Sequence, residues 1–581
     1  MARLLEHFPN LVTMFLTRAQ EKGDEPFLWA KRGGAWQPIS WRETARQVAA
    51  LATSLKRIGL ERGDRVMLVS ENRPEWLIAD LAIMAAGCVT VPTYTTNTSR
   101  DHTHILGNSG AKAVIVSTQK LAKTLMPAVL FSADCHHIIG IDDIRTGQAT
   151  EERQFHHWAE LIAGDADVAA LFEHCRSIGR QDLACIIYTS GTGGAPRGVQ
   201  QHHGAILHNV EACVEVISTD FGWGDEIFLS FLPPSHAYEH TGGQHFPVGT
   251  GAQIYYAESL EKLSANIEEV KPTIMVVVPR LFEMLRARIL KALEKSGALS
   301  NYLLKRALDI GAARYEGRVK PWDVPMDKIL DFTVRKKAQA RFGGRIKAMV
   351  SGGAPLNPDV GLFFQSLGLT LLQGYGQTEA GPVISCNRPK AGVRMDTVGP
   401  PLLNTEVRIA EDGEIMVRGE NVMHGYWCNP EETARVLQDG WLATGDVGHL
   451  DDKGRIVITD RKKDLIVNDK GDNVSPQRVE GMLTLQPEIA QAMVYGDRRP
   501  HLVALLVPDP EFEGTPDLQQ RLSKAVDRVN AELSILERVR RFAVADQPFT
   551  IDNEELTPSM KIRRHVLKQR YSERLDALYA R

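Results

Sequence analysis

Short apolar runs alternate with longer amphipathic stretches along the chain up to about residue 450. The short runs are rich in β-branched residues and bounded by turn residues, which predicts strands, whereas Glu75 to Ala86 and Leu260 to Val270 repeat apolar residues at helical spacing. Strands that alternate with helices predict a layered α/β architecture with largely buried sheets. The predicted strands are Arg65 to Val69, Ala113 to Ser117, Ala184 to Tyr188, Ile227 to Phe231, Gln253 to Tyr256, Ile274 to Val278 and Ile346 to Ser351.

The pattern becomes helical after Leu281, where apolar residues recur three and four positions apart. We therefore expect a helical insertion over about residues 281–345. Its last part begins with Arg335-Lys336-Lys337 and contains no acidic residue as far as Lys347. Such a basic segment would suit anionic lipid headgroups or a phosphorylated substrate, but a solvated helix face is the simpler explanation.

A second change of pattern follows the turn at Asp451-Asp452-Lys453-Gly454. The very polar stretch Asp460 to Asp464 separates this turn from new strand and helix patterns, which continue to the end of the chain. A chain of 581 residues is also longer than one hydrophobic core supports. We predict a large N-terminal α/β domain of several subdomains over residues 1–460, a hinge at 461–463 and a small α+β domain over 464–581.

The composition is that of an ordinary soluble protein, with 43% hydrophobic and 24% charged residues. The formal charge is only −4, so no global field favours nucleic acid, and an anionic ligand needs a local site. Glu6 and Pro9 interrupt the start, where a signal peptide requires an unbroken apolar stretch. Asp80 and Gly87 interrupt the most apolar window. We therefore expect a cytoplasmic protein without a membrane span, with at most peripheral contact to the cytoplasmic face of a membrane.

The seven cysteines are widely spaced and include no CxxC pair, so we expect buried free thiols in a reducing compartment. Histidines occur in pairs at His102 and His104, at His136-His137 and at His202-His203, but without Cys or acidic partners at metal-ligand spacing. We therefore expect no structural zinc. The sequence indicates no oligomeric state.

The segment from Ile187 to Val199, IYTSGTGGAPRGV, carries the clearest chemical signal. It follows an apolar strand and precedes a helical pattern, and such a loop offers backbone N–H groups and hydroxyls to a phosphate. It is not a Walker A loop, because Gly198 is followed by Val-Gln instead of Lys-Ser or Lys-Thr. Taken alone, a surface loop rich in Gly, Ser and Thr would explain it.

The segment closely resembles the phosphate-binding signature YTSGTTGxPKGV of the adenylate-forming superfamily, which includes acyl-CoA synthetases, peptide-synthetase adenylation domains and luciferases. Two positions differ from that signature. Gly193 replaces the second Thr and removes a hydroxyl, and Arg197 replaces the Lys, which keeps the charge but changes its shape. Neither change abolishes an anion site.

Further motifs of the superfamily follow in its order, so that the resemblance spans at least residues 188–561. Singly, Asp446 could be a turn residue, Glu379 an acid favoured at a helix start and Lys561 one charge of a basic helix, but the ordered set favours membership. The matching segments are Leu232-Pro-Pro-Ser-His236, Ser351-Gly-Gly-Ala-Pro355, Gly374-Tyr-Gly-Gln-Thr-Glu379, Trp441-Leu-Ala-Thr-Gly-Asp446, Asp460-Arg-Lys-Lys-Asp464 with Lys470-Gly471, and Leu556-Thr-Pro-Ser-Met-Lys561.

The resemblance implies a role for each of these positions. Lys561, Glu379 and Thr189 are the implied catalytic residues, and Glu379 and Thr189 are the implied Mg²⁺ ligands. The implied substrate pocket contains His236, Tyr238, Gly352 and Gly374. The implied residues for ATP and coenzyme A are Ser190, Gly191, Thr192, Gly193, Gly194, Arg197, Gly353, Ala354, Pro355, Tyr375, Gly376, Gln377, Thr378, Asp446, Arg461, Lys463 and Gly471.

The implied reaction joins a carboxylic acid to a thiol in two steps. The carboxylate attacks the α-phosphorus of ATP to give an acyl-adenylate and pyrophosphate, and the thiol of coenzyme A then displaces AMP. The helical insertion, the Asp460 to Asp464 hinge and Met560 before the lysine resemble long-chain fatty acyl-CoA synthetases. Bile acids, aryl acids and polyketide-like acids stay open as substrates. The alternatives are an acyl-adenylate ligase that delivers to a carrier protein and a non-catalytic binding protein with the same fold.

Overall fold

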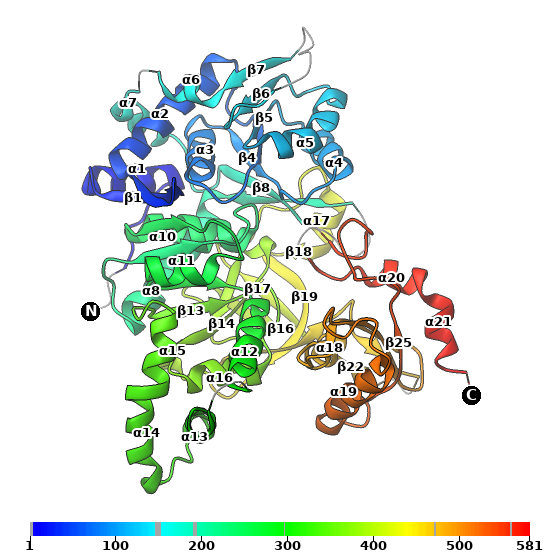
Figure 1. Cartoon of the computed structure of the whole chain (residues 1–581). Coiled ribbons are helices and arrows are strands. Elements are labelled where there is room, and N and C mark those ends of the chain that lie inside the picture. The colour runs from blue at the N-terminus through cyan, green and yellow to red at the C-terminus, as the bar shows by residue number, and fades with distance from the viewer. Residues whose placement is uncertain are drawn as a thin grey trace.

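The computed structural model describes residues 4–145, 153–164, 166–189, 195–294, 297–469, 472–557 and 560–580. These residues form two large sheets covered by helices, a third sheet beside them, and a small C-terminal domain that lies to one side of the large domain (Figure 1). This arrangement confirms the predicted α/β class and the combination of a large and a small domain.

The first large sheet has seven strands. They are β3 (Arg65–Val69), β4 (Val89–Pro92), β5 (Ala113–Val116), β6 (His137–Gly140), β7 (Gln154–His157), β8 (Leu183–Thr189) and β9 (Arg197–His202). Their order is β7-β6-β5-β3-β4-β8-β9, and all neighbours are parallel except the antiparallel hairpin of β8 and β9. The strands predicted at 65, 113 and 184 are confirmed.

The second large sheet has eight strands. They are β1 (Pro26–Arg32), β2 (Ala35–Ser40), β10 (Ile227–Ser230), β11 (Gln253–Tyr256), β12 (Ile274–Val277), β13 (Ala348–Ser351), β14 (Leu371–Gly376) and β15 (Val383–Cys386). Their order is β15-β14-β13-β12-β10-β11-β1-β2, mostly parallel in the middle with antiparallel pairs at both edges. The predicted strands at 227, 253, 274 and 346 are confirmed within this sheet.

The main core lies between the two large sheets, where apolar residues of both meet a layer of helices. The helix α3 (Pro74–Ala85) has no polar face and is buried along its whole length, as expected for a helix covered on all sides. Further helical elements in or near this layer are α1 (Leu11–Lys22), α2 (Trp41–Arg57), α8 (His203–Asp220), α10 (Phe246–Thr250) and the π-helical turn η1 (His240–His245). The large domain also contains α4 (Ser99–Ser109), α5 (Gln119–Phe131), α6 (Trp158–Ile162), α7 (Val168–Cys175) and α11 (Leu263–Val270).

A third sheet connects the large sheets to the C-terminal domain. It consists of β16 (Glu406–Ile409), β17 (Glu414–Arg418), β18 (Leu437–Gln438), β19 (Trp441–Leu450) and β20 (Ile456–Arg461), which pair in antiparallel fashion. The short helix α17 (Pro430–Val436) lies before β18. Strand β20 ends at Arg461, so the polar stretch that follows leaves directly from a strand edge.

The helical segment expected near 281–345 is present as a series of helices, of which α13 and α14 extend away from the large domain (Figure 1). They are α12 (Pro279–Glu294), α13 (Ala298–Tyr315), the 3-10 turn η2 (Pro321–Asp323), α14 (Val324–Leu330), the π-helical turn η3 (Asp331–Arg335) and α15 (Lys336–Arg341). They pack through a few apolar residues on one another and on α16 (Pro358–Ser366).

The C-terminal domain has a three-stranded sheet of β23 (Ile489–Tyr495), β24 (Leu502–Pro508) and β25 (Val539–Val544), and a two-stranded ribbon of β21 (Ile466–Val467) and β22 (Asn473–Val474). Strand β24 is buried on both faces, because alternate residues enter two different cores. The helices are α18 (Pro476–Thr484), α19 (Leu518–Glu532), α20 (Arg564–Arg570) and α21 (Ser572–Ala577).

The structure also bears on membrane spans and on the cysteines. In the described part of the chain, no helix combines the length and apolar character that crossing a membrane requires. All seven cysteines are free, as expected, and most are buried. Cys428 is an exception, because it lies exposed at a position with φ of 52° in the turn before α17.

Candidate active site

The hairpin of β8 and β9 carries the glycine-rich loop at its tip. Thr189 ends β8 and pairs with Arg197, which begins β9. The hydroxyl of Thr189 therefore lies at the carboxyl end of a buried strand, the edge at which open α/β sheets bind their ligands. The predicted phosphate ligands Ser190, Gly191, Thr192, Gly193 and Gly194 lie outside the described residues.

Arg197, where the signature has lysine, is held by two side chains. Its guanidinium forms an ion pair with Glu432 and lies 4.8 Å from the ring centroid of Tyr426. Backbone pairing explains this contact, because the Trp427 N–H donates to the Gly198 carbonyl at 2.7 Å beside it. A planar guanidinium can stack on a ring and bind a carboxylate at once, whereas an ammonium acts as a point charge.

Tyr426 also reaches Glu379, the predicted Mg²⁺ ligand. Glu379 lies in the short turn η4 (Thr378–Ala380) directly after β14, and the Tyr426 hydroxyl donates to its Oε1 at 2.9 Å. The side-chain amide of Gln201 donates to the Thr378 carbonyl, which ties the turn to β9. The second carboxylate oxygen accepts no hydrogen bond from the described residues. Carboxylate and hydroxyl oxygens are the donors that Mg²⁺ prefers, so Glu379 and Thr189 fit this ion chemically.

Tyr375 and Asp446, both predicted nucleotide residues, are in direct contact. The Tyr375 hydroxyl donates to Asp446 Oδ2 at 2.8 Å, and the Arg461 Nε lies 3.2 Å from Asp446 Oδ1. Burial raises the pKa of Asp446, while Arg461 and the Tyr375 hydrogen bond act in the opposite direction. A buried carboxylate held in this way can accept hydrogen bonds from hydroxyls of a ligand.

Lys561 reaches this region from the C-terminal domain. Its backbone N–H donates to Thr557 Oγ1 at 3.0 Å, which fixes the backbone at Lys561. Burial and the charge of Arg461 lower the pKa of Lys561, and the carboxylates of Glu379 and Asp446 raise it. The lysine thus lies within electrostatic reach of both acids, although its side chain keeps contact with solvent.

Two aromatic residues of the predicted substrate pocket, His236 and Tyr238, are in contact. Tyr238 donates from its hydroxyl to the Val350 carbonyl at 2.7 Å, and its N–H donates to His236 Nδ1 at 3.1 Å. A Cβ at Gly352 would lie 2.9 Å from the Tyr238 ring, so only glycine fits there without movement. Burial and the charge of Lys561 lower the pKa of His236 to about 4, which keeps the imidazole neutral at pH 7.

The remaining predicted site residues lie on strand β14, in exposed turns or outside the described residues. Gly374 and Gly376 flank Tyr375 on β14, and a Cβ at Gly376 would collide with the Pro382 carbonyl. Lys463 lies exposed in the turn after β20, and Gly471 lies outside the described residues. Gly353, Ala354 and Pro355 form an exposed turn after β13, and Gln377 and Thr378 lead from β14 into η4.

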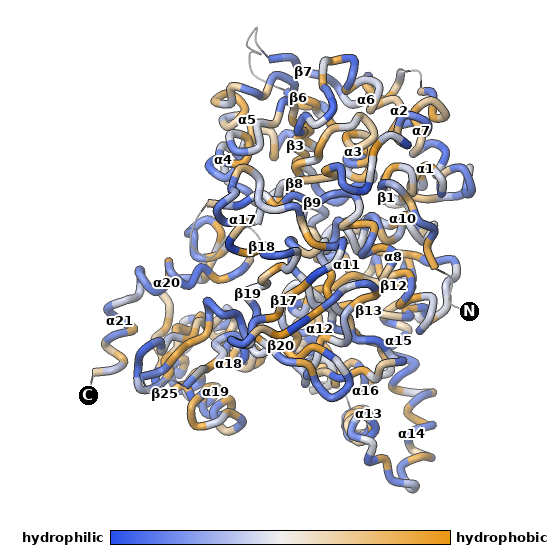
Figure 2. The backbone as a smooth tube through the Cα atoms, turned by 180° about the vertical axis from the view of Figure 1, so that it is seen from behind, coloured by the Kyte–Doolittle hydropathy of each residue, from blue (hydrophilic) through white to orange (hydrophobic). Residues whose placement is uncertain are grey.

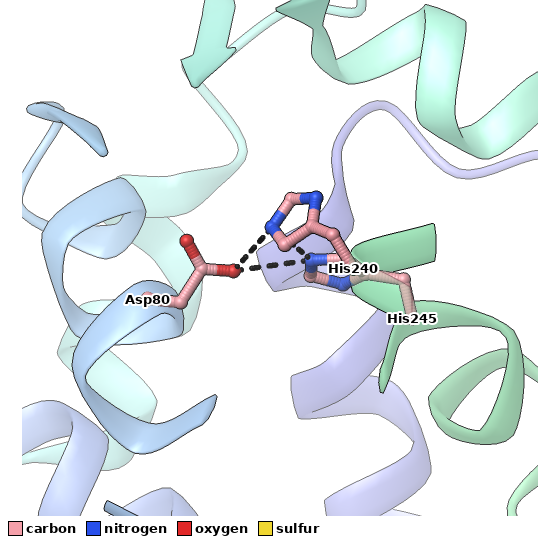
Figure 3. A group of neighbouring side chains, drawn as sticks. All are labelled: Asp80, His240 and His245. Carbon is pink, nitrogen blue, oxygen red and sulfur yellow. Dashed lines mark hydrogen bonds and ion pairs between the residues drawn. The ribbon is translucent and has the colours of Figure 1, made fainter. Parts of the chain in front are cut away.

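A buried cluster that no sequence motif indicates lies elsewhere, between α3 and η1. Asp80 Oδ2 is 3.0 Å from His240 Nε2 and 3.1 Å from His245 Nε2, and all three side chains are fully buried (Figure 3). Their ligand atoms lie within 4.8 Å of one another, close enough to share a metal ion. Asp80 is 160 residues from His240, so linear spacing gives no signal for this cluster.

The contacts around this cluster favour a hydrogen-bonded carboxylate–histidine group over a metal centre. A metal-bound imidazole normally donates its other N–H to an acceptor, but neither His240 Nδ1 nor His245 Nδ1 has a hydrogen-bond partner among the described residues. Burial opposes ionisation of Asp80, but the two histidines outweigh it and hold its pKa below the ordinary range. The cluster therefore ties α3 to η1 through a buried carboxylate.

Comparison with known proteins agrees with this geometry. Residues 15–427 match the family model of the AMP-binding enzymes, and residues 463–581 match that of the AMP-binding enzyme C-terminal domain. A long-chain-fatty-acid–CoA ligase of Mycobacterium tuberculosis is 33% identical over 98% of this chain and 97% of its own length. A chloroplastic long-chain-fatty-acid–[acyl-carrier-protein] ligase of Arabidopsis thaliana is 28% identical, over 93% of this chain and 83% of its own length.

Among solved structures, the adenylation domain of a carboxylate reductase from Mycobacterium chelonae has the same fold. Its TM-score is 0.75 at 23% identity, over 99% of this chain and 92% of that chain. The family models together extend over most of the residues that carry the motifs. The chain therefore belongs to the AMP-binding enzyme family, the adenylate-forming superfamily, and resembles the long-chain acyl-CoA synthetases within it.

Proposed function

We propose that this chain is an ATP-dependent acyl-CoA synthetase that activates a medium-chain or long-chain fatty acid, or a related carboxylic acid. The reaction consumes ATP and coenzyme A and releases AMP and pyrophosphate. The name of the Mycobacterium tuberculosis relative, a long-chain-fatty-acid–CoA ligase matched over nearly its whole length, supports this substrate class.

The convergence of Lys561 with Glu379 and Asp446 carries the proposal. These residues are far apart in the sequence, and the charges of Glu379, in the turn after β14, and Asp446, within β19, both act on Lys561. A nucleotide phosphate brought between them would bring its own negative charge, which Lys561 offsets. This arrangement suits the first half-reaction, in which charge develops on a phosphate during attack by a carboxylate.

The other residues act on different parts of the substrates. Asp446 accepts hydrogen bonds from the ribose hydroxyls, and Tyr375 exchanges its present bond to Asp446 for a contact with adenine. Neutral His236 lines the pocket without adding a positive charge next to Lys561. Mg²⁺, when held by Glu379 and Thr189, would neutralise phosphate charge.

The second half-reaction requires a different arrangement of the two domains. A thiol must reach the acyl carbon, where Lys561 and its turn now approach the site. We propose that the C-terminal domain, residues 464–581, turns about residues 461–463 and withdraws Lys561. The exposed position of Lys463 suits a hinge, because its side chain is solvated before and after such a turn.

A carrier protein is the alternative acceptor. The Arabidopsis thaliana relative is named as a ligase for an acyl-carrier protein, and the first half-reaction is the same for both acceptors. A third possibility is a binding protein that has kept the fold without catalysis, in which Gly193 and Arg197 have weakened the phosphate loop.

One assay separates these three functions. The purified chain is given ATP, Mg²⁺ and a panel of carboxylic acids, with coenzyme A, with a phosphopantetheinylated carrier protein, or with neither, and nucleotide and thioester products are identified. We expect AMP, pyrophosphate and an acyl-CoA, and an acyl-adenylate on the enzyme when no thiol is present. ADP as product would contradict the mechanism. Thioester on the carrier alone would assign the alternative, and no turnover would assign the binding protein.

A further inference from the structure

The helix that runs from η2 through α14 to α15 presents large apolar side chains to solvent. The exposed fraction is 72% for Trp322, 45% for Val324, 51% for Ile329 and 78% for Phe332. The helix is anchored by its other side, where Leu330 is fully buried against α13. Figures 1 and 2 both show α14 extending away from the rest of the molecule. Soluble surfaces rarely gather exposed aromatic and aliphatic residues in this way without a partner.

Lysines alternate with these apolar residues on the same face. Val324, Lys328, Phe332 and Lys336 follow at intervals of four residues, which places them next to one another on a helix. All four side chains are exposed. Figure 2 shows that hydrophilic and hydrophobic residues are mixed along α14. A lysine beside an aromatic residue can lay its apolar stem along the same surface and keep its charge in water.

The acids of this segment are neutralised by arginines. Asp323 pairs with Arg306 at 2.6 Å, and Asp331 pairs with Arg335 at 2.7 Å. Asp327 also binds Arg335, at 2.7 Å, and Glu316 binds its neighbour Arg318.

The lysines, in contrast, stay available as cations. Lys320, Lys328, Lys336 and Lys337 form no ion pair with any residue that the structure describes, and Lys320 lies 5.5 Å from the centroid of the Trp322 ring. The field around the apolar residues is therefore positive. The basic segment that begins at Arg335 therefore offers fewer free cations than its sequence suggests, because Arg335 and Lys347 both form ion pairs.

We propose that this surface, defined by Trp322, Val324, Lys328, Ile329, Phe332 and Lys336, docks the protein on a bilayer that contains anionic lipid. Aromatic residues at the level of the headgroups supply apolar burial, and the unpaired lysines supply attraction to the negative surface. The surface lies on a segment that extends from the molecule, so it can contact a flat bilayer while the large domain stays in water. The proposal holds for any acyl substrate and requires no catalysis.

The test is co-sedimentation of the full chain with vesicles, in the absence of ATP, coenzyme A and acid. Vesicles of phosphatidylcholine with phosphatidylglycerol are compared with vesicles of phosphatidylcholine alone, at low and high salt. We expect binding to the anionic vesicles that weakens as salt increases. The variant Lys328→Gln with Lys336→Gln should bind more weakly, roughly fivefold for each lysine removed. The variant Trp322→Ala with Phe332→Ala should bind about tenfold more weakly.

The matched control is Leu130→Ala with Phe131→Ala at the end of α5. These residues are also exposed, at 51% and 84%, but α5 lies far from α14, at the opposite end of the molecule (Figure 1). This variant should bind as the unchanged chain does. Absence of binding to anionic vesicles at low salt, or equal losses in all three variants, would overturn the proposal. Loss of a dimer in the Trp322 and Phe332 variant, without vesicle binding by the unchanged chain, would assign the surface to a second copy.

Discussion

Arg197, Tyr426 and Glu379 form a continuous line of contacts from the glycine-rich hairpin to the proposed Mg²⁺ ligand. The arginine stacks on the tyrosine ring, and the tyrosine hydroxyl fixes one oxygen of the carboxylate. An Arg at the position where the signature has Lys is therefore coupled to the metal site through packing as well as charge. Tyr426 acts as a positioning residue in this arrangement.

The variant Tyr426→Phe tests that role. It keeps the ring under Arg197 and removes only the hydrogen bond to Glu379, so the Mg²⁺ concentration for half-maximal adenylation should rise. A bond of this kind contributes about 1 kcal/mol, or roughly fivefold. Excess Mg²⁺ should restore most of the rate. The control is Tyr579→Phe, whose hydroxyl binds backbone carbonyls in the C-terminal domain. An unchanged Mg²⁺ requirement in Tyr426→Phe would refute the positioning role.

The sequence motifs identify most residues of the candidate site but few of their partners. Lys561, Glu379, Asp446 and Tyr375 lie in short segments whose residue types and order resemble the superfamily, and the fold brings all four together. Glu432 and Tyr426 lie in no such segment, and they meet the site only because backbone pairing with β9 aligns them. Partners that depend on tertiary pairing leave no linear pattern.

At the scale of elements, strand positions follow from the sequence because buried parallel strands are short, β-branched and bounded by turns. The predicted strand Gln253 to Tyr256 has the observed bounds. The strands β16 to β20 are less visible, because many of their residues are only partly buried or exposed. The pattern of apolar residues also does not predict the order of strands in a sheet, because β1 from the start of the chain pairs with the distant β11.

One ion pair holds α20 against α18 in the C-terminal domain. Glu480 is nearly buried and binds Arg564 through both oxygens, at 2.6 and 2.5 Å. Arg564→Leu should leave the carboxylate buried without its partner and destabilise this domain by about 3–5 kcal/mol. Arg574→Leu is the control, because its pair with Asp546 is exposed on both sides and should cost less than about 1 kcal/mol.

Hydrogen exchange at the amides of α18 and β23 measures both variants. Faster exchange throughout the C-terminal domain in Arg564→Leu, with little change in Arg574→Leu, is the expected result. Similar exchange in both would show that the buried pair adds nothing beyond a surface pair. The pair lies three residues from Lys561, so the same variant should also reduce adenylation.

At the scale of the whole molecule, buried neutral histidines should make stability depend on pH. Burial lowers the pKa of His102 to about 4 and that of His203 to about 3. The unfolded chain binds a proton at each of these residues below about pH 6.5, and the folded chain does not until the lower value is reached. The unfolded state therefore binds more protons in this window, and each such histidine lowers stability as the pH falls through it.

The variant His102→Gln isolates one such contribution. The free energy of unfolding of the unchanged chain should fall more steeply between pH 6.5 and 4 than that of the variant, by about 1.4 kcal/mol per pH unit. Tryptophan fluorescence during urea unfolding is a suitable probe, because every tryptophan lies at or before Trp441 and so reports the large domain. Identical slopes in the two chains would mean that His102 titrates normally in the folded state.

The two-domain site gives a further prediction for Lys561→Ala. Adenylation should fall by about 10² to 10³, the usual cost of losing one donor that stabilises developing charge. Thioester formation from supplied acyl-adenylate should be nearly unchanged, because the lysine is expected to leave the site for that step. Rapid-quench measurement of each half-reaction gives the two rates separately. Equal losses in both would contradict the proposed turn of the domain.

The double burial of β24 has a consequence for how such chains are inherited. Both cores around this strand consist of residues between Ile466 and Tyr579, so the C-terminal domain brings its own interior and borrows none from the rest of the chain. A genetic crossover near the codons of the hinge would join two parts that each fold as before. A lineage can therefore acquire its lysine and its nucleotide-binding sheets from different ancestors, and only the residues that face each other across the junction must then adapt.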